Sequence, residues 1–198
     1  MLIAKYMFFI TSFGNAAVVG ALVVTTAVYL VMAGCRRPAL AVALTFVLAA
    51  SGATIAKLLC MGCPVNSLDP ALHSPSGHVA ISTAVYGMMT TIIAAQTKGW
   101  QRRLVWAAGF LLIALIAASR VLLRFHTFDE VMVGLVIGGV SYEIVRRFVL
   151  RNAVVRFNGW AFATTALVVV FLFHNMQIPF EQAIQWLAQH IRAHIAVC

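Results

Sequence analysis

Long apolar runs are the feature of this sequence that most constrains its fold. A helix needs roughly 20 apolar residues to cross a bilayer, and a chain in lipid must satisfy its backbone hydrogen bonds internally, which favours helices. Hydrophobic residues make up 63% of the 198 positions and charged residues only 10%, which is outside the range of soluble proteins. The candidate spans lie at about 13–33, 39–60, 77–95, 104–123, 130–147 and 159–177. We therefore predict an all-α, polytopic membrane bundle of about six transmembrane helices, with residues 1–198 forming a single domain.

The basic residues are concentrated in alternate connections between these spans. The chain has a net charge of +9, and nine of its fourteen Lys and Arg residues fall in three segments, 36–37, 98–103 and 146–156. Alternate connections share one side of the membrane, and the positive-inside rule makes that side cytoplasmic. The connections 61–76 and 124–129 then face outside. This distribution excludes nucleic acid as the partner and leaves two roles for the basic loops, fixing topology or binding lipid head groups.

Both ends of the chain predict short helices beside the bundle. Residues 1–13 are apolar but contain Lys5, and we expect a short interfacial helix on the outer side. At the other end, residues 179–197 place apolar side chains at helical spacing and glutamines on the remaining face. We interpret this segment as an amphipathic helix on the outer surface, or alternatively as a capping or oligomer contact.

The string Pro75-Ser76-Gly77-His78 directly precedes the third span. Proline and serine are favoured at the start of a helix, and Gly77 allows a ligand to approach the backbone closely. The first amide groups of a helix lack intrahelical acceptors and carry the positive end of the helix dipole, so they form an anion site. An ordinary capped helix start explains Ser76 and Gly77 without a ligand. His78 goes beyond that explanation, because an imidazole beside a phosphate can gain a proton and pass it to a leaving oxygen.

A second histidine follows the fourth span, in the string from Ser119-Arg120 to His126. A cation near a span end is costly unless it faces a cavity or an anion, and the guanidinium of Arg120 suits bidentate binding of a tetrahedral anion. Glu130 lies four residues after His126, so its carboxylate can orient the imidazole and leave the other ring nitrogen as a nucleophile. The alternative is a capping box between Thr127 and Glu130, and both roles can coexist. Snorkelling to the interface explains Arg124.

Lys57 and the nearby cysteines add weaker signals. Lys57 lies about one turn before the outer loop 61–76, where snorkelling is the ordinary explanation for a lone lysine. Its alternative role is a third cation for a phosphate, together with Arg120 and the helix start at Ser76. Cys60 and Cys63 form a C-x-x-C string that fits two ordinary thiols, a local disulfide or a redox pair.

Together these residues resemble the type-2 phosphatidic acid phosphatase (PAP2-type) superfamily, the membrane branch of the vanadium-haloperoxidase-like acid phosphatases. Its pattern is a lysine with an arginine-proline pair downstream, then Pro-Ser-Gly-His, then Ser-Arg-x5-His-x3-Asp. Residues 75–78 match the second element fully, and Ser119, Arg120 and His126 match the third. The resemblance covers about residues 57–138.

Two positions depart from this pattern. Glu130 stands where the family has aspartate, and the arginine of the first element is absent, since Cys63 precedes Pro64 at its spacing. The missing arginine puts affinity or substrate choice in doubt, and Arg124 is a candidate to replace it.

The resemblance implies roles for the residues that match. His126 would attack phosphorus and form a phosphohistidine, His78 would protonate the leaving group, and Glu130 would orient His126. The phosphate oxygens would be held by Lys57, Arg120, Ser76 and the Gly77 amide. No metal or other cofactor is expected.

The function that follows is that of a lipid phosphatase, with the bilayer and a membrane lipid phosphate as its partners. Its substrate would be a lipid phosphomonoester or pyrophosphate: polyprenyl pyrophosphate, phosphatidate, phosphatidylglycerophosphate or lipid A phosphate. Its location would be a bacterial inner membrane, with the site facing outward. The alternatives are a lipid phosphotransferase with the same site, a non-catalytic lipid-phosphate binder, and a cytochrome with two histidine haem ligands.

Overall fold

The regular structure of the chain is entirely helical over the residues that the computed structural model describes, namely 2–62, 74–150, 157–174 and six separate positions between 176 and 190. This confirms the predicted all-α bundle. The helices are α1 (Leu2–Ser12), α2 (Ala16–Met32), α3 (Arg36–Gly62), α4 (Gly77–Ala94), α5 (Gly99–Leu122), α6 (Phe128–Phe148) and α7 (Gly159–Phe173).

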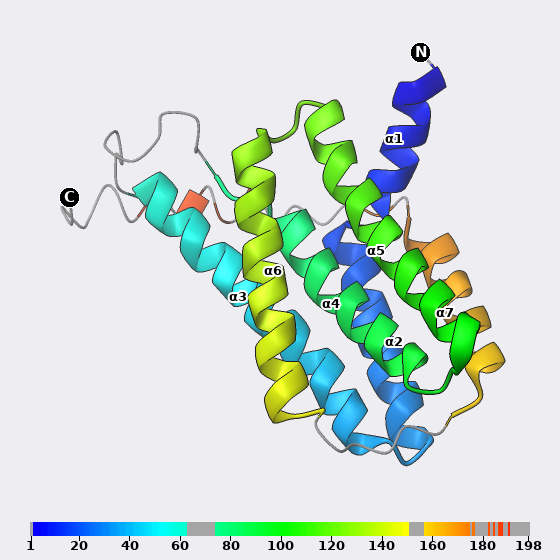
Figure 1. The fold of residues 1–198 in the computed structure, drawn as a ribbon. Helices are drawn as coiled ribbons and strands as arrows, with labels where there is room; N and C mark the ends of the chain where they lie inside the picture. The colour runs from blue at the N-terminus through cyan, green and yellow to red at the C-terminus, as the bar shows by residue number, and fades with distance from the viewer. Residues whose placement is uncertain are drawn as a thin grey trace.

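Helix α4 is the centre of the bundle. It packs against α2, α3, α5 and α6, and Figure 1 shows it enclosed by these neighbours. In the most apolar 18-residue stretch of α4, 67% of the residues are buried, whereas the corresponding share in α5 is 17%. Helix α5 therefore presents most of its surface to the surroundings. The histidine string at the start of α4 therefore enters the middle of the bundle.

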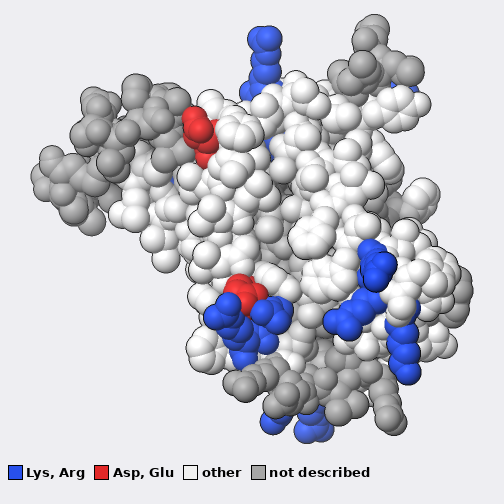
Figure 2. All heavy atoms as spheres, viewed as in Figure 1, with Lys and Arg blue, Asp and Glu red and all other residues white. Residues whose placement is uncertain are grey.

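Within the described ranges, four helical stretches are long and apolar enough to cross a membrane: Lys5–Met32, Arg36–Cys60, Gly77–Ala94 and Gly99–Leu122. This makes the chain a membrane protein. The fifth and sixth predicted spans coincide with α6 and α7, which are helical but are not among these four. Figure 2 shows Lys and Arg side chains gathered at the lower end of the molecule, the end at which α2 joins α3 and α4 joins α5 in Figure 1.

Glycines on α6 bring its backbone against α4. A Cβ added to Gly134 would lie 2.7 Å from the Ser76 carbonyl oxygen and 3.2 Å from Cβ of Val79. Gly138, one turn later, approaches the Ala80 carbonyl even more closely. Because any larger side chain would force the helices apart, these glycines fix the separation of α4 and α6 where the predicted site begins.

The N-terminal helix α1 differs from the expectation of a separate interfacial helix. It packs against α5, and α2 begins after a short turn in which the Asn15 side chain accepts a hydrogen bond from the Ala17 amide at 3.1 Å. The first apolar span accordingly begins near Lys5 rather than near residue 13. Aromatic packing explains this position, because Phe8 contacts Phe125 edge-on with ring centroids 5.9 Å apart.

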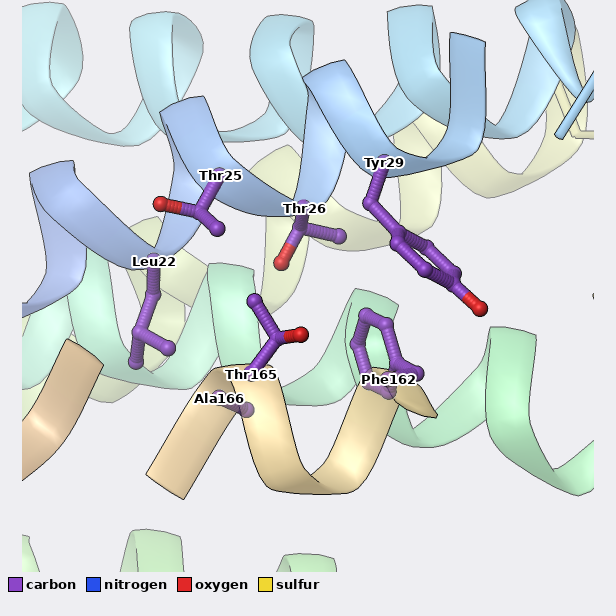
Figure 3. Close-up of a pocket in the computed structure, with 7 residues that line it drawn as sticks. All are labelled: Leu22, Thr25, Thr26, Tyr29, Phe162, Thr165 and Ala166. Carbon is purple, nitrogen blue, oxygen red and sulfur yellow. The ribbon is translucent and has the colours of Figure 1, made fainter. Parts of the chain in front are cut away.

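Helix α7 closes the bundle against α2. Figure 3 shows Thr25 and Thr26 of α2 facing Thr165 and Phe162 of α7, around a cavity of about 10 Å³. This space is about that of one water molecule. The predicted amphipathic helix at 179–197 lies largely outside the described residues; its described positions 182, 184, 186, 187 and 190 are helical.

Candidate active site

The loop between α5 and α6 holds His126 in a defined position. Helix α5 ends at Leu122, and Arg124 adopts a left-handed conformation with φ 56° that turns the chain back. The amides of Phe125 and His126 then both donate to the Arg120 carbonyl, at 3.0 and 3.3 Å. The backbone of Arg120 and the backbone of His126 are thereby tied together.

Glu130 orients the imidazole of His126. Its Oε2 lies 2.8 Å from His126 Nδ1 and also accepts the Thr127 amide at 3.1 Å, while the Thr127 hydroxyl accepts the Glu130 amide at 3.3 Å. The capping box and the orienting contact, which the sequence left as alternatives, are therefore both present. With its proton on Nδ1 facing a carboxylate, the ring leaves Nε2 as the nitrogen that can attack.

The same glutamate reaches the segment before α4. Glu130 Oε1 accepts the Ser74 amide at 2.8 Å, and the Glu130 backbone carbonyl accepts the Ser76 amide at 3.1 Å. These bonds join two motifs that lie about fifty residues apart in the chain. Glu130 is only 5% exposed, which shields the contacts from water.

Positive groups converge at the start of α4. Lys57 is 2% exposed and does not snorkel outward; a Cβ built on Gly77 would lie 3.6 Å from its Cε and 4.0 Å from its ammonium Nζ. The ammonium of Lys57 and the amides at the start of α4 therefore place positive charge at the same point, where an anion would be stabilised. Ser76 is at the N-cap, but its buried hydroxyl makes no capping bond and has no hydrogen-bond partner among the described residues. This hydroxyl and the nearby helix amides form a site suited to an anionic oxygen.

Arg120 is held from two sides. Its Nη1 donates to the Thr11 hydroxyl at 3.3 Å, and its guanidinium carbon lies 4.6 Å from the centroid of the Phe125 ring. A planar cation stacked on a ring and anchored by a hydroxyl keeps a fixed orientation. Helix α1 thus contributes directly to the position of this arginine.

His78 and Arg120 line an open cavity of about 580 Å³. The other lining residues come mostly from α1 and from the ends of α5 and α7: Lys5, Phe8, Phe9, Thr11, Ser12, Asn15, Phe125 and His174.

Arg124 does not line this cavity, and its side chain is exposed, so the structure gives no support to its replacing the missing arginine. Lys5 and Thr11 were not identified as site residues from the sequence. Only Lys5 gave a signal, as the charge that interrupts the first apolar run.

Electrostatic interactions connect the two histidines with the cations. His78 interacts electrostatically with His126. Each of the two histidines also interacts electrostatically with Arg120 and Lys57. Burial lowers the pKa of His126 below its usual 6.5; the hydrogen bond to Glu130 opposes this effect, and Arg120 reinforces it. The imidazole is therefore neutral at pH 7, as a nucleophile must be.

The described ranges contain no group of three or more His, Cys, Asp or Glu side chains placed to hold a metal ion. The independence from metals that the sequence predicts remains a prediction. Of the cysteine pair, Cys60 is a partly buried free thiol, whereas Cys63 lies outside the described residues.

An oriented imidazole, a second histidine, a buried lysine, an arginine and a helix start lie at one end of the helix bundle, and this combination is suited to binding a phosphoryl group. The chain belongs to the PAP2 superfamily, whose family model matches residues 6–153. This match confirms the family expected from the motifs. Phosphatases that act on phosphate esters, often those of lipids, are typical of this superfamily.

The chain is also similar to a curated protein of Klebsiella pneumoniae described as an uncharacterized 22.5 kDa protein in the cps region. The two are 28% identical over 85 residues, which is 43% of this chain and 41% of that protein. The chain thus matches less than half the length of this relative. No solved structure matches the chain significantly.

Proposed function

We propose that this protein is a membrane lipid phosphatase that hydrolyses a lipid phosphomonoester or pyrophosphate through a phosphohistidine intermediate. The observation that carries this proposal is the 2.8 Å contact between His126 Nδ1 and Glu130 Oε2, together with the buried ammonium of Lys57 at the start of α4. Such a pair has no evident structural need beyond the capping box, which Thr127 and Glu130 already complete without the histidine.

The first step of the proposed reaction transfers the phosphoryl group to the protein. Nε2 of His126 attacks phosphorus, the bond from phosphorus to the lipid oxygen or to the outgoing phosphate breaks, and protonated His78 donates its proton to that oxygen. Arg120, Lys57, the Ser76 hydroxyl and the Gly77 amide stabilise the three equatorial oxygens, whose charge grows in the transition state.

The second step releases phosphate. His78, now neutral, takes a proton from a water molecule that attacks the phosphohistidine, and the bond from phosphorus to Nε2 breaks. Glu130 keeps the proton on Nδ1 throughout, so Nε2 of His126 is both the attacking nitrogen in the first step and the leaving nitrogen in the second. If a lipid hydroxyl replaces the water, the same site acts as a phosphotransferase.

The cavity supports a lipid substrate. Its lining combines the polar groups of His78 and Arg120 with the rings of Phe8, Phe9 and Phe125. A phosphate attached to an apolar chain can therefore place its head group among the cations while its first carbons contact the rings. Lys5, also in the lining, offers a further cation. The concentration of basic side chains at the opposite end supports an outward-facing site in a bacterial inner membrane.

The test is phosphate release from a panel of lipid phosphates by purified protein in detergent, compared with His126→Ala and His78→Ala variants. We expect both variants to insert and to lose turnover, whereas His190→Ala, which changes an exposed histidine near the C-terminus, remains active. Acid-labile phosphate on the wild-type protein and none on His126→Ala would identify the intermediate. Equal, slow release by wild type and His126→Ala on every lipid would favour a non-catalytic lipid-phosphate binder, which the missing first-motif arginine keeps in contention.

A further inference from the structure

A second cavity, of about 470 Å³, is lined by residues of α4, α5 and α6 and opens between α5 and α6. Helices α5 and α6 each pack closely on α4 but make few contacts with each other. Figure 1 shows these two helices nearest the viewer, with α4 behind the space between them. Side chains leave this space open as a groove toward the surroundings, because the cavity is only partly enclosed.

The groove runs along the membrane-spanning direction. On α4 its floor is formed by Thr83, Gly87 and Thr91, which follow one another at intervals of about one turn. On α5 its wall runs from Arg102 to Ile113, and eleven residue-to-residue rises of a helix span about 16 Å. This length is about half the roughly 30 Å of a bilayer hydrocarbon core, the depth of one leaflet.

The middle of the groove is apolar and open. Trp106 and Phe110 of α5 stack with ring centroids 5.6 Å apart, and Phe110 is 65% exposed. Opposite them, a Cβ added to Gly139 would meet nothing within 4 Å, so this glycine leaves free space rather than close packing. The ring of Tyr142 covers Gly87, and its hydroxyl is 2.9 Å from that of Thr91, which leaves an aromatic surface facing the groove.

The end of the groove beside the start of α5 and the end of α6, which we call its basic end, is rich in arginine. Arg102 and Arg146 line it, Arg103 and Arg147 lie beside them, and Glu143 is the carboxylate among these four arginines. Glu143 engages Arg146 with two contacts of 2.7 Å, and it also contacts Arg147. Four guanidinium groups and one carboxylate leave an excess of three positive charges at this end. Figure 2 shows two groups of basic side chains on this face, one of them around a carboxylate.

We propose that this groove binds one anionic glycerophospholipid of the leaflet at the basic end of the protein, separately from the candidate active site. One acyl chain lies along Trp106, Phe110 and Gly139, and the phosphate is held between Arg102 and Arg146. The charge excess selects an anionic head group over a zwitterionic one, and the leaflet-deep apolar groove selects a lipid over a soluble phosphate. This inference does not depend on the proposed catalytic activity.

The experiment uses Trp106 as the reporter, in full-length protein whose other three tryptophans are replaced by phenylalanine. The protein is reconstituted in phosphatidylcholine vesicles that contain equal fractions of brominated phosphatidylglycerol or brominated phosphatidylcholine, and quenching of Trp106 fluorescence is titrated against lipid fraction. We expect brominated phosphatidylglycerol to quench with several-fold higher apparent affinity. Equal quenching by the two lipids would overturn the proposal.

Charge variants test the head-group contacts. Arg102→Gln and Arg146→Gln should each reduce the preference for phosphatidylglycerol about fivefold, the effect expected of one arginine near an anionic surface. The matched control is Arg37→Gln, an exposed arginine at the start of α3 that neither lines the cavity nor belongs to the four arginines of its basic end, and it should keep most of the preference. Glu143→Gln should raise the preference, because it releases Arg146 from its carboxylate. An unchanged preference in both lining variants would refute the site.

A groove variant tests the acyl-chain contact. Gly139→Phe should fill the open space and reduce quenching by both lipids, whereas Gly139→Ala should leave it nearly unchanged. Undiminished quenching in Gly139→Phe, with the fold verified by circular dichroism, would show that no chain occupies the groove.

Discussion

Replacing Glu130 by glutamine tests the central contact of the site while preserving its size. The carboxylate accepts three hydrogen bonds, from His126 Nδ1, the Thr127 amide and the Ser74 amide. An amide group has one oxygen, so it can serve Ser74 or the other two, but not all three. If its nitrogen faces His126, the imidazole must accept a bond at Nδ1 and move its proton to Nε2, which removes the attacking lone pair.

The magnitude follows from the bond that is lost. A hydrogen bond to a charged group contributes about 1.5–3 kcal/mol. Since 1.36 kcal/mol is a tenfold change in rate, kcat/KM should fall about 10- to 150-fold. Glu130→Asp keeps the charge but is one methylene shorter, so it cannot reach all three donors, and its activity should fall between wild type and Glu130→Gln.

The assay is the initial rate of phosphate release from the best lipid substrate in detergent micelles, with melting temperatures measured in parallel. Asp129→Asn is the matched control, because it removes a neighbouring exposed carboxylate from the same helical turn and should retain wild-type activity. A Glu130→Gln protein within twofold of wild type would show that His126 needs no carboxylate, and the nucleophile assignment would lose its support.

Four further outcomes are expected. Thr11→Val removes the hydroxyl that holds Arg120 and should raise KM about 2- to 12-fold with little change in kcat, and Thr11→Ser should restore it; a pure kcat effect would argue against a role in binding. Lys5→Gln should likewise raise KM, most for substrates with two phosphates, and an unchanged KM for all of them would remove Lys5 from the site. The lowered pKa of His126 means that the neutral, attacking form persists below pH 6.5, so the acid limb of kcat/KM should have its midpoint under 6.5; a midpoint above that value would contradict the burial of this ring. Chelators should leave turnover intact, and loss of activity restored only by a divalent ion would contradict the metal-free mechanism.

Much of the fold was predictable because apolar length and charge placement are local properties of a sequence. The helices α3 to α6 begin and end within about five residues of the predicted spans, and the capping box at Thr127 was readable from its spacing. The segment 1–13 was harder, because composition alone does not show what a short apolar helix packs against. Contacts of α1 with α5 decide its place, and these depend on side chains more than a hundred residues away.

The motifs predicted the residue types of the site but not how they are connected. The spacing from His126 to Glu130 anticipated their contact, since residues four apart share a helical face. The bonds from Ser74 and Ser76 to Glu130 could not be anticipated, because nothing in the sequence gives the separation of α4 and α6. The burial of Lys57 was likewise hidden, since a lone lysine near a span end usually reaches the interface.

The hydrogen atom that serves as the side chain of Gly134 has a consequence for how this protein can vary. Ser76 can donate to the carbonyl of Glu130 only while the two backbones remain nearly in touch, and a single methyl group at position 134 would meet the Ser76 carbonyl at 2.7 Å. An alanine there would displace this backbone, and we expect it to lower the proposed activity without altering any group that takes part in the chemistry. Such a protein would keep every histidine and cation, so an intact set of motifs in a related sequence is insufficient evidence of an active enzyme.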